Sequence, residues 1–154
     1  METPKEAREE HVRLSVSADI SEAKATMKVI ISIIPPESHR YCTCGDWALN
    51  PDGDLEIRVS EMGNLTYSLM IAIHELAEWI VCNHTGVTEG TVDHWDMVWC
   101  RNSDDPGDEP GCPYAQGHST GVAIERLLCA TLNIPWSVYD KVVCAAVPPE
   151  IDCS

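Results

Sequence analysis

The sequence predicts an α+β fold in which a small antiparallel sheet, of about three strands with a hairpin, packs on a central helix and two or three further helices. Three features predict this fold. Residues 28–34 are rich in β-branched side chains, residues 54–60 alternate between apolar and polar side chains, and residues 65–82 form a long and mainly apolar run. The first two patterns are typical of strands, and the third is typical of a buried helix.

The first strand of the predicted sheet covers residues 28–34 and stops at two consecutive prolines. A hairpin follows, with strands over residues 42–49 and 54–60 joined by the turn Asn50-Pro51-Asp52-Gly53. Proline at the first central turn position and glycine where a positive φ is needed make this a favoured turn sequence. Alternation predicts that three residues of the second hairpin strand face the core: Leu55, Ile57 and Val59.

The central helix is predicted from residue 65 to residue 82. Asn64 is suited to cap its amino end, and Gly86 is suited to the left-handed conformation that ends a helix. A second helix is expected from Thr88, with an apolar stripe that consists of Val92, Trp95 and Trp99.

Two further helices are predicted after the acidic, proline-containing loop at residues 103–111. One covers residues 120–132, and the other covers residues 137–146. The buried stripe expected on the first of them consists of Ile124, Leu127, Leu128 and Leu132.

Length and composition indicate one globular domain. The 154 residues are 44% hydrophobic and 23% charged, which is unlike a disordered chain or a membrane protein. We expect a peripheral amino-terminal arm at residues 1–25, a single domain at residues 26–147 and a tail at residues 148–154. The first ten residues lack the apolar core of a signal peptide, so a cytoplasmic location is expected. The eight cysteines should then be reduced thiols.

The charge balance argues against one class of partner. There are 25 acidic and 10 basic side chains, and the net charge is -15. Such a chain is repelled by a phosphate backbone, so direct binding to nucleic acid is not expected.

A candidate metal site lies in the central helix. Its only acidic, basic or imidazole side chains are His74, Glu75 and Glu78. His74 and Glu78 are one turn apart and lie on one helix face. Two carboxylates in an apolar helix need a compensating cation or proton, and a divalent metal would supply such a cation. The pattern is HExxE, related to the HExxH of zinc peptidases, in which the intervening glutamate is the general base.

A metal site needs at least one more ligand, because a catalytic zinc has three protein ligands and a structural zinc has four. His118 is the preferred candidate. It follows the acidic loop and directly precedes the third predicted helix, so the chain can fold back over the central helix there. Three other residues are candidates for an additional ligand or for a residue that hydrogen-bonds a ligand: Asp96, His94 and Glu125.

The predicted chemistry is hydrolysis. A metal lowers the pKa of its bound water, and Glu75 would accept a proton as that water attacks a carbonyl carbon. The strand at residues 54–60, if it forms the sheet edge, could align an extended peptide. A peptide or protein substrate is therefore expected, with cleavage of a peptide or amide bond. Zn²⁺ is the expected metal, with Mn²⁺, Fe²⁺ and Ni²⁺ as alternatives.

The order of elements, strands and a hairpin before a helix with the HExxE motif, resembles the minimal zincin fold of small metallopeptidases. More narrowly, most of residues 27–143 resembles a group of small, uncharacterised proteins encoded by bacteriophages. That resemblance implies a viral origin, the host cytoplasm as the location and a site at His74, Glu75, Glu78 and His118 with Asp96 nearby. The stretches that carry it are Cys44-Gly45-Asp46-Trp47, Ile57-Arg58-Val59-Ser60-Glu61-Met62-Gly63, His74-Glu75-Leu76-Ala77-Glu78, Asp105-Pro106-Gly107-Asp108 and Ile124-Glu125-Arg126.

Two other functions are compatible with the sequence. The charge would suit a non-enzymatic acidic protein that inhibits or decoys a host protein, with a structural metal holding its helices together. Alternatively, Glu75-x-x-Glu78 and Asp93-x-x-Asp96 resemble the paired magnesium-binding motifs of all-helical nucleotide pyrophosphohydrolases. That function would use no histidine and leaves the hairpin unexplained.

Overall fold

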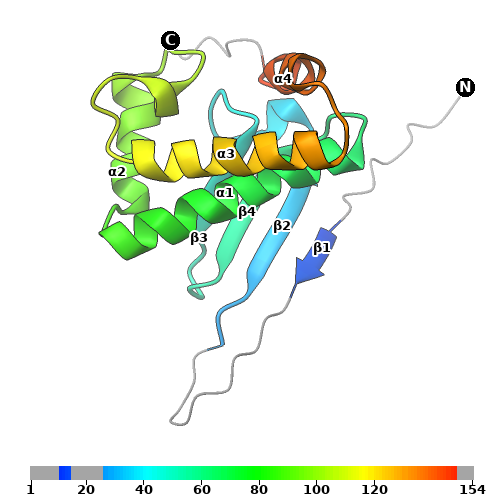
Figure 1. The fold of residues 1–154 in the computed structure, drawn as a ribbon. Coiled ribbons are helices and arrows are strands. Elements are labelled where there is room, and N and C mark those ends of the chain that lie inside the picture. Colours follow the sequence, from blue (N-terminus) through cyan, green and yellow to red (C-terminus); the bar gives the residue numbers. More distant parts are fainter. Residues whose placement is uncertain (1–10, 15–25, 149–154) are drawn as a thin grey trace, which may run out of the picture.

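A mixed β-sheet forms one layer of the protein (Figure 1). The computed structural model describes residues 11–14 and 26–148. The strand order in the sheet is β1-β2-β4-β3, and the short β1 adds to the edge of the three predicted strands. The bounds are His11–Leu14 for β1, Val29–Ile34 for β2, Gly45–Leu49 for β3 and Leu55–Ser60 for β4.

The prediction of a purely antiparallel sheet is wrong for one pair of strands. β3 and β4 form the expected antiparallel hairpin, and Gly53 in its turn has a φ of 81°. β2, however, runs parallel to β4. After β2 the chain passes through the short 3₁₀ turn η1, Pro36–Ser38, and a loop, so that the hairpin returns with β4 against β2.

The burial of β4 explains why it takes an inner position. Leu55, Ile57 and Val59 are each 0% exposed, which confirms the predicted core face. Because β4 lies between β2 and β3, it cannot align a peptide by strand addition as considered from the sequence. The edge on this side of the sheet is β3.

The central helix α1, Leu65–Thr85, was predicted correctly. The Asn64 side chain accepts a hydrogen bond from the Thr66 amide, and Gly86 ends the helix in the left-handed conformation with a φ of 81°. By length and composition alone α1 could cross a membrane. In this fold it is the core helix, and it lies between the sheet and helix α3 (Figure 1).

The second helix is shorter and less regular than expected. α2 covers Glu89–His94 and continues into η2, a π-helical turn at Trp95–Trp99. Val92 is buried, but Trp99 is 71% exposed, so the predicted stripe is wrong at its last residue. The wider π turn rotates Trp99 away from the face that an α-helix would give it.

The third helix, α3, differs from its prediction in its start and in its buried face. It covers Ala115–Thr131 and begins five residues before the expected start, so that His118 lies within its first turn. Leu127, expected in the core, is 66% exposed, and Leu132 is 47% exposed. The buried face instead consists of Gly117, Gly121, Glu125 and Cys129.

The last helix, α4, covers Trp136–Ala145 and packs on α3, close to its predicted position. The seven cysteines in the described part of the chain are free thiols. Apart from β1, the expected arm at residues 1–25 lies outside the described residues, and so does the expected tail from residue 149 onward.

Candidate metal centre

Two glycines bring α3 close to the motif face of α1. A Cβ atom at Gly117 would lie 3.0 Å from Glu78 Cγ, and one at Gly121 would lie 2.5 Å from His74 Cγ. The second distance is too short for any real Cβ contact. Glycine at position 121 therefore allows α3 to cover His74 at this separation, and a side chain at position 117 would crowd Glu78.

Two more glycines make room for the other candidate residues. A Cβ atom at Gly45 would lie 2.4 Å from Glu75 Oε1, and one at Gly107 would lie 2.3 Å from His118 Cγ. Each of the four side chains of the predicted centre is thus faced by a glycine. Sequence reasoning missed these glycines, although the Gly-x-x-x-Gly spacing of residues 117 and 121 around His118 was a signal of close helix packing.

His74, Glu78 and His118 lie together with donor atoms that converge. Glu78 Oε2 lies 3.6 Å from His74 Nε2 and 3.6 Å from His118 Nδ1. One ligand atom from each residue lies within 4.8 Å of those of the other two. The structure therefore brings the three sequence-predicted ligands to one point.

The second ring nitrogen of His74 is held by a carboxylate. His74 Nδ1 donates to Glu125 Oε1, and Tyr139 OH donates to Glu125 Oε2 over 2.6 Å. Tyr139 is 0% exposed and Glu125 is 5% exposed, so this chain of hydrogen bonds is shielded from water. It fixes the ring so that Nε2 faces Glu78.

His118 and Glu78 also contact side chains outside the cluster of candidate ligands. His118 Nε2 lies 3.3 Å from Asp105 Oδ1 and 3.6 Å from Asp108 Oδ1, which is an ionic contact without an aligned hydrogen bond. The Trp47 indole donates to Glu78 Oε1 over 3.0 Å. Glu78 Oε2 is thereby left free toward the histidines.

The carboxylates hold positive charge at both histidines. Burial acts to lower the pKa of His74, but its contacts with Glu125 and Glu78 outweigh burial and raise the pKa to about 11. Burial likewise opposes protonation of His118, while Asp105 and Glu78 raise its pKa to about 10. The cluster thus favours two bound protons or a cation in their place.

The two motif glutamates have opposite electrostatics. Burial, followed by the charge of Glu78, raises the pKa of Glu75 well above its ordinary value. Burial acts in the same direction on Glu78, but His118 and His74 outweigh it and lower its pKa. Glu78 is therefore suited to be an anionic ligand, and Glu75 is suited to accept a proton.

The donor set fits a divalent transition metal. Tetrahedral ligands at zinc–nitrogen and zinc–oxygen bond lengths are about 3.3 Å from one another, close to the 3.6 Å spacings in this cluster. Two imidazoles and one carboxylate suit Zn²⁺, Mn²⁺, Fe²⁺ or Ni²⁺. Carboxylates behind both histidines are the usual outer partners of metal-ligating imidazoles.

Asp96 has a different role from the one considered from the sequence. It was a candidate for an additional ligand or for the residue that accepts the free ring proton of a ligand histidine, which Glu125 does at His74. Asp96 instead accepts hydrogen bonds from Tyr114 OH and Tyr41 OH. Its side chain lines the cavity beside the three candidate ligands.

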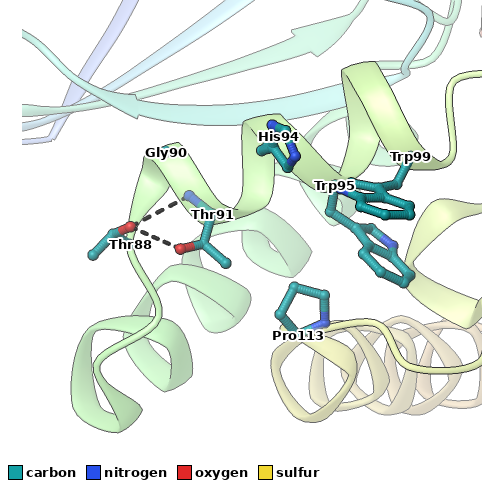
Figure 2. A pocket seen from close by; sticks show the side chains of 7 residues that line it. All are labelled: Thr88, Gly90, Thr91, His94, Trp95, Trp99 and Pro113. Carbon is teal, nitrogen blue, oxygen red and sulfur yellow. Dashed lines mark hydrogen bonds between the residues drawn. The ribbon is translucent and has the colours of Figure 1, made fainter.

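Two other residues are not brought to the centre. His94 is exposed and lines a separate pocket, shown in Figure 2, with Thr88, Gly90, Thr91, Trp95, Trp99 and Pro113. Asp93, which the magnesium alternative requires, pairs with Arg40 over 3.0 Å. Neither residue lines the cavity of the candidate centre.

Tyr139→Phe tests the support behind His74. Removing the hydroxyl frees Glu125, the outer partner of His74, to rotate, and we expect affinity for zinc to fall by about 10-fold, the lower end of the range for loss of such a partner. Competition with a chromophoric chelator measures the affinity. Tyr67→Phe is the matched control, because Tyr67 packs edge-on against Tyr139 but contacts no candidate ligand. An unchanged affinity in Tyr139→Phe would exclude this role.

Comparisons with known proteins leave the centre to be interpreted from its own geometry. The chain matches no protein-family model, no curated protein and no solved structure.

Proposed function

We propose that the protein is a zincin-like, metal-dependent hydrolase that cleaves a peptide or amide bond, with His74, Glu78 and His118 as the metal ligands. The observation that supports this proposal most is that one donor atom from each of the three residues lies close to the other two. The two histidines also contact further carboxylates through their other ring nitrogens. Zn²⁺ is the proposed metal. When bound, it would act as a Lewis acid and make a coordinated water molecule more acidic.

Glu75 is the proposed general base. Its carboxylate lines the cavity beside Glu78, and burial raises its pKa, which makes it a stronger base. Glu75 would accept a proton from water as the oxygen attacks the carbonyl carbon. It would then deliver that proton to the amine nitrogen as the carbon–nitrogen bond breaks.

An extended substrate would pair with β3, which is the sheet edge, rather than with β4. Gly45 in β3 lies against Glu75, and Trp47 donates to Glu78. The other end of β3 is covered, because the Leu49 amide donates to Glu89. At the end nearer the centre, Thr43 Oγ1 bonds both the amide and the carbonyl of Gly45, so a peptide would have to displace these two contacts to pair with β3 there.

Cleavage of a peptide library tests the proposal directly. We expect new peptide termini, detected by mass spectrometry, with zinc-loaded protein and none after chelation, with recovery on adding zinc back. Cleavage that persists with chelator would contradict metal dependence. An absence of cleavage with each of the four metals above would contradict the proposed hydrolysis.

Metal binding should depend steeply on pH. With pKa values of about 11 and 10, His74 and His118 are protonated at pH 7 in the absence of metal. Both must lose a proton to bind, so affinity should rise by about 100-fold per pH unit around neutrality. Calorimetric titration in two buffers of different ionisation enthalpy should report about two protons released. Release near zero would show that the histidines do not bind the metal.

A further inference from the structure

The candidate centre opens into a cavity of about 600 Å³. Its wall includes residues of β3, α1, η2, α3 and α4, the loop at residues 41–44, and residues 101–107, which lead into the acidic loop. A space of this volume holds a side chain or a short peptide segment. The charges on its wall therefore bear on what enters it.

Asp96 is a buried carboxylate on this wall without a cationic partner in the described part of the chain. It is 9% exposed, and its hydrogen bonds come from the neutral hydroxyls of Tyr114 and Tyr41, the latter over 3.2 Å. A carboxylate offers about four lone-pair sites, so these donors leave capacity for another. Burial raises the pKa of Asp96 to about 7, so its charged form would be stabilised by a cationic partner.

The rest of the wall is also negative. Glu75, Asp104 and Asp140 also line the cavity, and none of them forms an ion pair with another described residue. Among the described residues that line the cavity, Arg101 is the one lysine or arginine. The charge of Asp46 is offset by Arg40, whose Nε lies 2.8 Å from Asp46 Oδ2. A divalent cation at the centre would offset two charges and leave the wall negative. Such a cavity attracts cationic groups and repels anionic ones.

We propose that this cavity binds a cationic group of the substrate, an ammonium or a guanidinium, and that Asp96, oriented by Tyr41 and Tyr114, is the residue that recognises it. The proposal rests on the proposed function, because it names the substrate class of that same centre: peptides with a lysine or arginine side chain or a free amino terminus beside the cleaved bond. Asp96 acts here as a specificity residue and not as a metal ligand.

Small probes test the proposal without turnover. We would titrate zinc-supplemented protein with n-butylguanidinium, n-butylammonium, neutral 1-butanol and anionic butyrate, and follow the indole resonances by NMR. We expect both cations to bind about 10-fold or more tightly than 1-butanol, as hydrogen bonds to charged groups allow. Asp96→Asn should remove this preference. Asp52→Asn, which makes the same change at an exposed residue outside the cavity, should keep it.

Equal binding of cations and 1-butanol to the wild type, or tighter binding of butyrate, would overturn the proposal. A cation preference that survives in Asp96→Asn would also overturn it. Metal content measured on the same samples separates this from the proposed function. Protein that holds zinc but shows no cation preference contradicts only the substrate class, whereas protein that holds no zinc contradicts the metal centre.

Discussion

Glu75→Gln is expected to lower the rate of metal-dependent hydrolysis by about 10²- to 10⁴-fold, the usual contribution of a general base. Glutamine keeps the shape of the side chain but cannot accept the proton. Glu75 lies in the cavity wall outside the His74, Glu78 and His118 cluster, so bound metal should be unchanged. Loss of a partly buried charge with a raised pKa should leave the melting temperature equal or higher.

The assay for Glu75→Gln is cleavage of the best peptide from the library, with metal equivalents measured on the same preparation. Glu37→Gln is the matched control, because it makes the same charge change at an exposed residue outside the cavity. Loss of metal together with activity would show that Glu75 is a ligand. Unchanged activity would show that another group is the base or that the activity comes from a contaminant.

Gly121→Ala is expected to destabilise the fold and the centre together. In an ordinary helix this change is stabilising, because glycine is about 1 kcal/mol less favourable than alanine. Here the new methyl would lie 2.5 Å from His74 Cγ, so either the ring must leave Glu125 or α3 must move away from α1. Overpacking of this kind costs roughly 1–3 kcal/mol, which corresponds to a fall in melting temperature of about 3–10 °C for a chain of this size.

Thermal unfolding and zinc affinity of Gly121→Ala would be measured beside Gly90→Ala. A Cβ at Gly90, also in a helix, meets nothing closer than Thr88 Oγ1 at 4.0 Å, so that variant should match or slightly exceed the wild type. Opposite signs for the two changes are the expected result. A Gly121→Ala variant as stable as the wild type, with full zinc affinity, would contradict the close packing of α3 on the centre.

Local signals made α1 and its motif predictable. Asn64 and Gly86 act within one helical turn of their positions, and His74, Glu75 and Glu78 are conspicuous because their helix is otherwise apolar. The hairpin was predictable for the same reason. Its turn and the alternation of its second strand are both short-range features.

The errors concern features that depend on distant parts of the chain. The parallel pairing of β2 with β4 depends on the path between strands, which no local pattern specifies. On α3 an apolar stripe was expected to face the core, but the buried face carries Gly121 and Glu125 because it packs on a polar centre. The contact of Tyr139 with Glu125 was missed because it arises only when α4 folds onto α3.

Metal content of the wild type and His74→Ala tests the central claim most directly. His84→Ala is the matched control, because it makes the same change in an exposed residue of the same helix. After exposure to zinc and removal of free metal, elemental analysis should give about one equivalent for the wild type and His84→Ala and far less for His74→Ala. Equal metal in His74→Ala and the wild type, or none in the wild type with zinc, manganese, iron or nickel, would contradict the metal centre.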